Sequence, residues 1–252
     1  MINKRTIQYW IDTVLKSTEL IQGNQHLSTK IKNTKRDVVT NVDLLIENFI
    51  LSRLKKYRIP FISEETKGNK KFNPKKKYLI LDPIDGTANF INNLTNFSIS
   101  IGYFAKNDFL YGVVCAPKLK ELFFTTEKKI SFLNGDKLKI EKKKLENSLI
   151  AISLPSENNE INNKIFFNLN ERSMGCIRQG SASLNICWVA SGKFQIACGF
   201  NAKIWDIAGA IPIAKYAGCK IILTPNKHNL HYDYIVAHPE VIQKVKEIIN
   251  EK

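Results

Sequence analysis

The sequence has no apolar stretch long enough to cross a bilayer and no close pair of cysteines or histidines. Its longest apolar stretches, 148–155 and 204–214, fall well short of the roughly 20 residues that a spanning helix needs. The 5 cysteines are odd in number, and the 4 histidines lack the spacing of metal ligands. We therefore expect no transmembrane helix, no disulfide framework and no zinc-type site, with reduced thiols in the core.

The N-terminal segment lacks the continuous apolar core of a signal peptide. Residues 10–21 interleave apolar side chains with Asp12, Lys16 and Glu19 at a spacing typical of an amphipathic helix. The sequence therefore predicts an N-terminal helix and a cytoplasmic protein.

Arginine is scarce, although the chain is strongly basic. Lys and Arg total 38 against 23 Asp and Glu, a net charge of +15, yet only 6 of the 38 are Arg. The lysines gather in the runs 67–77 and 137–144, without a nucleic-acid-binding motif and with few aromatic residues for base stacking. We expect a solvated surface that attracts anionic, phosphorylated substrates. A protein that binds RNA or a partner through the run from Lys67 to Lys77 is the remote alternative.

A composition of 44% hydrophobic and 24% charged residues is typical of a globular protein. The pattern of predicted helices and strands changes near residue 147. The first part predicts a helix over 43–57, strands over 59–62 and 78–81, and an antiparallel meander over 97–140. The second part alternates strands and helices, with one helix expected over 205–217. We expect an N-terminal α+β half, 1–147, and a C-terminal α/β half, 148–252, that pack together as one body.

Acidic residues stand where the predicted helices and strands begin or end. They are Asp37, Asp43, Glu64, Glu65, Asp82, Asp85 and Asp206. A single acidic residue at the start of a helix is ordinarily a cap. Asp82 and Asp85 differ, because one buried strand runs into both carboxylates, and so much buried charge requires a cation or a raised pKa.

Oxygen ligands without histidine or cysteine suit Mg²⁺ or Mn²⁺, ions that commonly bridge to a substrate phosphate. Gly86 and Thr87 add backbone N–H groups at the expected start of the next helix, which favours an anion there. The pattern indicates metal-assisted transfer of a phosphoryl group to water, which needs no Ser, Cys or His nucleophile.

At these residues the sequence resembles the inositol monophosphatase family of metal-dependent, lithium-sensitive phosphatases over nearly the whole chain. The matching segments are 37–43, 62–65, 82–87, 112–114 with 132–135, 180–183 and 205–208. The resemblance implies an α/β (α+β) fold, an αβαβα layered sandwich whose antiparallel sheet half is followed by a mixed α/β half. It also implies two or three metal ions between the halves, and a homodimer.

The resemblance implies a set of metal ligands. Glu64, Asp82 and the carbonyl of Ile84 would hold the first Mg²⁺. Asp82, Asp85 and Asp206 would hold the second, and Glu64 with waters would hold a weaker third. Glu65, Asp37 and Lys32 would support this set without binding metal, although Asp37 also suits a helix cap and Lys32 a solvated lysine.

The remaining site residues would act on water and substrate. Thr87, paired with Asp43, would orient the attacking water alongside Glu64, while the Gly86 and Thr87 amides hold the phosphate. Asp85, Asp206, Gly180 and Ser181 would contact the substrate, with a helix cap as the alternative for Ser181. Trp205 is expected in the core, and small residues at 208–210 are expected to allow close helix packing.

Substrate choice stays open. Family members that act on inositol phosphate usually have a Glu six residues before the Trp of the Trp-Asp motif, where this chain has Gly199. Ser63 and Ala116-Pro117 resemble the nucleotide-directed branch, whereas 85–90 departs from that branch's motif. The leading interpretation is a phosphatase of small sugar or polyol phosphates. The alternative is the same chemistry on adenosine 3′,5′-bisphosphate, NADP or fructose 1,6-bisphosphate.

Overall fold

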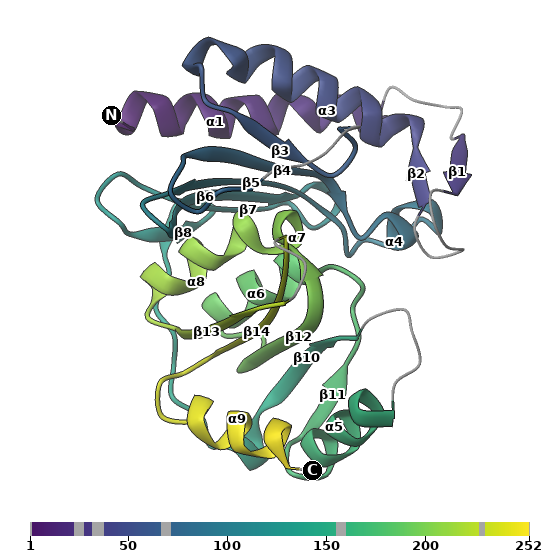
Figure 1. Ribbon diagram of the computed structural model, residues 1–252, viewed down its shortest axis with the longest axis vertical. Coiled ribbons are helices and arrows are strands. Elements are labelled where there is room, and N and C mark those ends of the chain that lie inside the picture. The colour runs from purple at the N-terminus through teal and green to yellow at the C-terminus, as the bar shows by residue number, and fades with distance from the viewer. Residues whose placement is uncertain are drawn as a thin grey trace.

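The computed structural model describes residues 2–22, 28–31, 38–66, 72–154, 160–226 and 230–251. Five layers follow one another: helices α1 and α3, a seven-stranded sheet, helices α6 to α8, a five-stranded sheet, and helices α5 and α9 (Figure 1). The expected αβαβα sandwich is therefore confirmed. Lys32, Asp37 and the lysines at 67, 70 and 71 lie outside the described residues.

Helices α1 (Lys4–Ser17) and α3 (Asn41–Leu54) form the first layer, with the short α2 (Glu19–Gln22) after α1. Both long helices begin at side-chain caps: Asn3 accepts from the Thr6 amide, and Thr40 forms a capping box with Asp43. Their buried faces, which include Trp10 and Ile46, pack on the sheet. The helix predicted over 43–57 thus begins two residues earlier and ends in a 3₁₀ turn at Lys55–Tyr57.

The seven-stranded sheet has the strand order β3-β4-β5-β6-β7-β8-β9, and all its neighbours are antiparallel except β3 and β4. Its strands are β3 (Phe61–Ser63), β4 (Tyr78–Asp85), β5 (Ser98–Ala105), β6 (Asp108–Ala116), β7 (Glu121–Thr125), β8 (Ser131–Leu133) and β9 (Asp136–Lys137). The predicted meander is present. The strand expected to end at Leu81 instead continues through Asp85, because a bulge between Asp82 and Asp85 keeps it paired with β5.

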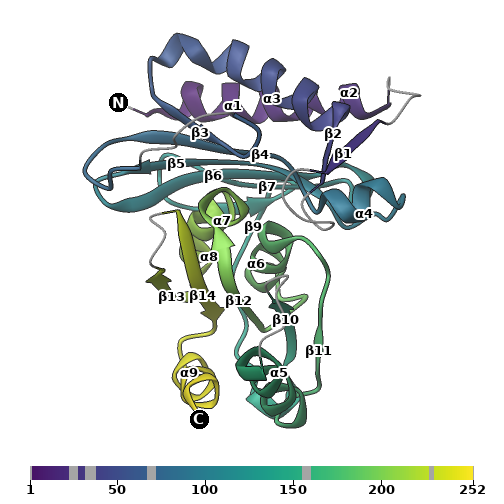
Figure 2. The ribbon, with the colours of Figure 1, turned by 45° about the vertical axis from the view of Figure 1, so that its right-hand side comes forward.

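A small two-stranded sheet and a short helix lie at one end of this sheet. Strands β1 (Thr29–Ile31) and β2 (Val38–Thr40) pair antiparallel, and α4 (Thr87–Ile91) lies beside them in both views (Figures 1 and 2). The loop that follows β4 therefore meets the start of α3 at this end.

The five-stranded sheet has the order β11-β10-β12-β14-β13 and mixed pairing, parallel around β10 and antiparallel around β14. Its strands are β10 (Leu149–Ser153), β11 (Gly175–Ile177), β12 (Ile196–Lys203), β13 (Lys220–Pro225) and β14 (His231–Ala237). Helices α5 (Glu160–Glu171) and α9 (Ile242–Asn250) cover its outer face. The predicted α/β character of the second half is confirmed.

Helices α6 (Ala182–Ala190), α7 (Ile204–Ala208) and α8 (Ala210–Ala217) fill the layer between the sheets. The single helix predicted over 205–217 is wrong, because the chain forms α7 and α8 with a break at Gly209. Pro212 explains the break, since it has no N–H to donate to the carbonyl of Ala208. One hydrophobic cluster joins both sheets through these three helices.

All five cysteines are free thiols, and every one except Cys176 is buried. No helix in the described ranges is long and apolar enough to span a bilayer.

Candidate active site

Two carboxylates end the buried strand β4. Its side chains are buried throughout, including Asp82 at 2% exposure and Asp85 at 7%. Asp82 pairs in register with Ser100 and Asp85 with Ser98, so two residues of β4 between them lie opposite the single residue Ile99 of β5. Two acidic side chains are thus held at the end of a buried strand, where little of either one is exposed to water.

Further carboxylates converge on Asp82 from separate elements. The pKa of Asp82 is raised well above its usual range, first by burial and then by the charges of Glu64, Asp85, Asp206 and Asp43. Within the described part of the chain, Asp82 Oδ1 is buried and has no hydrogen-bond partner. An orphaned, buried oxygen among like charges favours the binding of a cation or a proton.

Glu64 reaches this cluster from the turn after β3. Its backbone N–H donates to the Leu81 carbonyl at 3.2 Å, which continues the β3–β4 pairing past the end of β3. Buried Glu47 on α3 anchors the same turn: its carboxylate accepts from the Ser63 hydroxyl, from the Glu65 amide at 3.0 Å and from the Thr66 hydroxyl at 2.9 Å. Glu47 therefore fixes the backbone on both sides of Glu64.

Asp206 comes from the second half of the chain, in the first turn of α7. Its Oδ2 accepts from the Lys203 amide at 2.9 Å, which caps the helix. Burial, followed by Asp85 and Glu64, raises the pKa of Asp206, while the charge of Lys203 lowers it. The Lys203 ammonium also lies 3.6 Å from Glu64 Oε1. The cluster is thus shared between the two halves.

Asp85 binds the first turn of α6. Its Oδ2 accepts from the Ser181 hydroxyl at 2.6 Å and the Ser183 amide at 2.7 Å, and its Oδ1 accepts from the Ala182 amide at 3.2 Å. Burial raises the pKa of Asp85, and these hydrogen bonds oppose the rise. Ser181 is the N-cap of α6, so the cap considered for it from the sequence is present.

Thr87 and Asp43 stand at the edge of the cluster. The Thr87 hydroxyl donates to the Ile84 carbonyl at 3.0 Å, the same carbonyl that was expected to face a metal. Asp43 is fully buried and accepts from the Thr40 amide at 2.9 Å within the capping box of α3. The charge of Asp43 also contributes to raising the pKa of Asp82, less than burial and the other carboxylates do. The pairing of Thr87 with Asp43 stays a prediction.

Gly86 and Gly180 meet where the two halves touch beside the cluster. Gly86 has a φ of +96°, and a Cβ there would lie 3.3 Å from the Gly180 carbonyl. The Asn89 side-chain amide holds this junction, because Nδ2 donates to the Asn96 carbonyl at 2.6 Å and the Gln179 carbonyl at 2.7 Å. The backbone at Gly86 and Thr87 is therefore clamped to the start of α6.

The chemistry of the donors fits a hard divalent cation, since it consists of carboxylates and a carbonyl. Across the described ranges, however, no three Asp, Glu, His or Cys side chains are already gathered as a coordination shell. Both oxygens of Asp85 accept hydrogen bonds from the first turn of α6. The assignment of individual ligands accordingly stays a prediction, as do the roles of Lys32 and Asp37 outside the described residues.

Sequence reasoning missed three residues that shape the cluster: Glu47, Asn89 and Lys203. Glu47 follows Asp43 by one helical turn, so the spacing of two acidic residues on one face was a usable signal. Lys203 precedes Asp206 by three residues, the distance of a helix cap. Asn89 carries no such signal, because its partners lie in distant segments.

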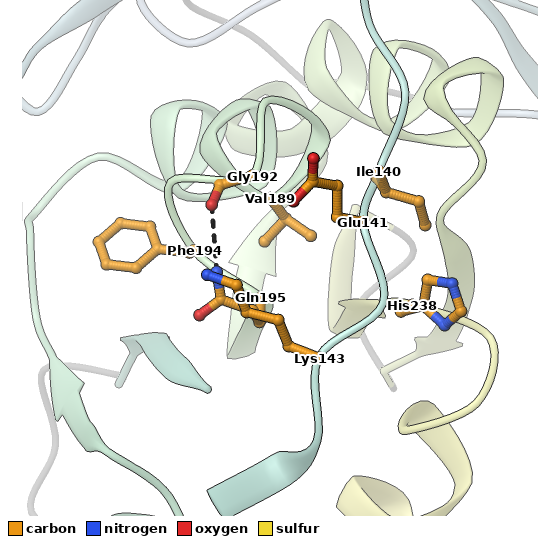
Figure 3. Close-up of a pocket in the computed structure, with 8 residues that line it drawn as sticks. All are labelled: Ile140, Glu141, Lys143, Val189, Gly192, Phe194, Gln195 and His238. Carbon is orange, nitrogen blue, oxygen red and sulfur yellow. Dashed lines mark hydrogen bonds between the residues drawn. The ribbon is translucent and has the colours of Figure 1, made fainter. Parts of the chain in front are cut away.

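A separate pocket lies at the other end of α6. Figure 3 shows it between the segment with Ile140 and Glu141 and the turn from Gly192 to Gln195, where Gln195 Nε2 donates to the Gly192 carbonyl at 3.1 Å. Lys143, Val189, Phe194 and His238 complete its lining. A helix of nine residues is about 13 Å long, so this pocket does not belong to the carboxylate cluster.

Comparison with known proteins gives one consistent family. The model of the inositol monophosphatase family matches residues 4–251. The fructose-1,6-bisphosphatase/inositol-1-monophosphatase of Thermotoga maritima is 28% identical over 225 residues, 86% of this chain and 85% of that protein. The Nus factor SuhB of Pseudomonas aeruginosa is 32% identical over 221 residues, 84% of this chain and 81% of its own.

Solved structures agree with this result. The crystal structure of an IMPase/NADP phosphatase complexed with Mg²⁺ and phosphate superposes with a TM-score of 0.86 at 25% identity, covering 98% of this chain and 96% of that one. The expected fold and the family resemblance are both confirmed.

Proposed function

The chain belongs to the inositol monophosphatase family, a family of phosphoric monoester hydrolases, and we propose that it is a Mg²⁺-dependent phosphomonoesterase acting on a small sugar or polyol phosphate. The observation that carries the proposal is the convergence of Glu64, Asp82 and Asp206 from separate elements of both halves, with Asp82 Oδ1 orphaned and buried among the described residues. A cluster with this much buried negative charge is suited to a cation that bridges to phosphate.

We assign the ligands as the resemblance implies. Glu64, Asp82 and the Ile84 carbonyl would hold one Mg²⁺, and Asp82, Asp85 and Asp206 a second, with a weaker third ion at Glu64. Bound ions of this kind offset the charge of the phosphate and lower the pKa of water. For Asp85 this assignment requires that its carboxylate be shared between a metal ion and the first turn of α6.

The side chains around the ligands would orient water and phosphate. Thr87 and Asp43 would position the attacking water, with Glu64 accepting its proton. The Gly86 and Thr87 amides would bind phosphate oxygens. The hydrogen bonds of the Asn89 side chain would keep this backbone in place. Gly180 and Ser181 would meet the alcohol part of the substrate, and Glu65 would support Glu64 from the next position.

A nucleotide or a bisphosphate is the second candidate substrate, and one observation favours it. Position 199 is glycine, so β12 presents no carboxylate there that would repel a second phosphate. Relatives named as a fructose-1,6-bisphosphatase/inositol-1-monophosphatase and as an IMPase/NADP phosphatase are consistent with either class. A homodimer, inhibition by Li⁺, use of Mn²⁺ in place of Mg²⁺ and a cytoplasmic location are further parts of the proposal.

The test is release of inorganic phosphate with and without Mg²⁺, and with added Li⁺, across a panel of substrates. The panel is inositol 1-phosphate, glycerol 2-phosphate, fructose 1,6-bisphosphate, adenosine 3′,5′-bisphosphate and NADP. We expect Mg²⁺-dependent release that Li⁺ inhibits and that Asp82→Asn abolishes. A faster rate on a nucleotide or a bisphosphate than on every polyol monophosphate would select the second candidate.

No release from any member of the panel would count against a phosphatase of these classes. Salt-sensitive RNA binding that is lost when Lys75, Lys76 and Lys77 become Gln would then favour the remote alternative. The relative named as a Nus factor makes this control worth including.

A further inference from the structure

Lys203 brings a positive charge into the carboxylate cluster. Its Nζ lies 3.6 Å from Glu64 Oε1, and the two side chains are 35% and 14% exposed. The same Nζ lies 5.5 Å from the centre of the Trp205 ring, within the range of a cation–π contact. Its charge also acts on Asp206. The ammonium thus lies beside Glu64 of the first half, and its charge acts on Asp206 of the second.

The local fold holds Lys203 and Asp206 together. Lys203 is the last residue of β12, pairs in register with His231 of β14, and donates its backbone N–H to Asp206 Oδ2 at 2.9 Å. Trp205, between them, is 6% exposed and packs in the central core. Because one turn fixes both residues, the ammonium is built into the site rather than attached to a mobile loop.

A fixed ammonium at this place acts in opposite directions on the two ligands of a phosphatase. It repels a divalent cation and shares the Glu64 carboxylate with it, but it attracts a phosphate dianion. Among the described residues, the other charges that act on Asp82 besides Glu64 and Asp206 are also negative: Asp85 and Asp43. Without Lys203, the cluster would favour metal more strongly and phosphate less strongly.

We propose that Lys203 is a phosphate-binding residue that weakens the affinity of the site for divalent metal while strengthening its affinity for phosphate. The inference rests on the proposed function, since it takes the carboxylate cluster to bind both ligands. It adds to that function a residue whose charge sets the balance between them.

The test compares Lys203→Met and Lys203→Arg with the wild type by isothermal titration calorimetry. Mg²⁺ is titrated first, and inorganic phosphate is then titrated at saturating Mg²⁺. Lys215→Met is the matched control. Lys215 lies on α8, is similarly exposed, and pairs with Asp108 of β6 at 2.6 Å. Thermal unfolding of each variant without metal establishes that it is folded.

We expect Lys203→Met to bind Mg²⁺ about fivefold more tightly and phosphate about tenfold more weakly, because one unit charge is removed near both ligands. Lys203→Arg keeps the charge and should stay within about twofold of the wild type for both. Lys215→Met should change neither affinity. This opposite movement is the signature, since damage to the fold would weaken both ligands together.

Two results would overturn the inference: a Lys203→Met protein that loses both affinities in parallel, and one that loses neither. A wild type that binds Mg²⁺ and phosphate but hydrolyses nothing in the substrate panel would refute the proposed enzyme while leaving the role of Lys203 supported. A wild type that binds neither ligand would refute both.

Discussion

Gly199 on β12 faces Tyr234 on β14 so closely that a Cβ at position 199 would lie 2.3 Å from Tyr234 Cε1. The tyrosine is 1% exposed, burial raises the pKa of its hydroxyl, and that hydroxyl donates to Ser153 Oγ at 3.3 Å. The phenol ring therefore fills the space that any side chain at 199 would need. The glycine at this place is a packing requirement of this chain.

Gly199→Ala should reduce the free energy of unfolding by about 2 kcal/mol, the usual scale of overpacking in a core. Urea unfolding measures the change. In a Tyr234→Ala background the same substitution should leave the free energy of unfolding nearly unchanged, because the ring that the new Cβ would overlap is absent. An equal cost in both backgrounds would show that Tyr234 is not the cause. Tyr234→Phe serves as the control, since it keeps the ring and loses only one long hydrogen bond.

The raised pKa of Asp82 makes the stability of the protein without metal depend on pH. A carboxyl whose native pKa lies above its unfolded value of about 3.9 binds protons more tightly in the folded chain. The free energy of unfolding therefore falls as pH rises between the unfolded and the native pKa, by up to about 1.4 kcal/mol per pH unit for one proton. Asp206 adds in the same direction.

With EDTA present, we expect a higher melting temperature at pH 5 than at pH 8, and a smaller difference once Mg²⁺ is added. Asp82→Asn should make the profile in EDTA shallower, with Asp206 still contributing, and stabilise the protein at pH 8 by about 1–3 kcal/mol, because a buried, unpaired charge is removed. Asp136→Asn on the exposed β9 is the control and should match the wild type. A melting temperature that rises from pH 5 to pH 8 in EDTA would contradict this account.

Glu47 should matter for the site without touching a ligand, because it ties Ser63, Glu65 and Thr66 to α3. We expect Glu47→Gln to lower the free energy of unfolding by about 2–4 kcal/mol, as for other buried charged hydrogen bonds. We also expect Mg²⁺ affinity about tenfold weaker, the usual effect of freeing a group that orients a ligand.

Calorimetry and urea unfolding measure the two effects of Glu47→Gln. Glu247→Gln on the exposed face of α9 is the matched control and should change neither. Ser63→Ala should cost less in the Glu47→Gln background than in the wild type, since the two side chains share one hydrogen bond. Unchanged Mg²⁺ affinity in Glu47→Gln would show that Glu64 does not depend on this anchor.

Local patterns revealed the carboxylates because Asp82 and Asp85 interrupt an apolar run, and a strand cannot bury such residues without a reason. They failed where tertiary contacts decide. The residue pattern of 196–203 does not predict that β12 extends to Lys203. The strand continues through polar residues because it stays paired with β14 on both sides of a bulge. Likewise, Lys203 and Glu64 are distant in sequence, so their contact exists only in the fold.

The small residues at 208–210 were expected to allow close packing, and this expectation is confirmed by the contacts of Gly209 and Ala208 with the sheet.

Those contacts lead to a last prediction, because the glycines of the sheet set how near α7 brings Asp206 to Asp82. A Cβ on Gly112 would lie 1.8 Å from the Gly209 carbonyl oxygen, and one on Gly102 would lie 2.4 Å from the Ala208 carbonyl. Gly112→Ala must therefore push the start of α8, and with it α7, away from β6. We expect a loss of about 3 kcal/mol in urea unfolding, at the upper end of overpacking costs, together with weaker Mg²⁺ binding.

Gly135→Ala separates this effect from backbone strain. Gly135 has a φ of +97°, and a Cβ there meets no atom within 4 Å, so alanine should cost only the strain of that conformation, about 1 kcal/mol. Its Mg²⁺ affinity should equal that of the wild type, because the β8–β9 turn is remote from Asp206. If Gly112→Ala behaved like Gly135→Ala in both measurements, the distance between α7 and the sheet would not control the site, and Asp206 would have to reach Asp82 by some other adjustment of α7.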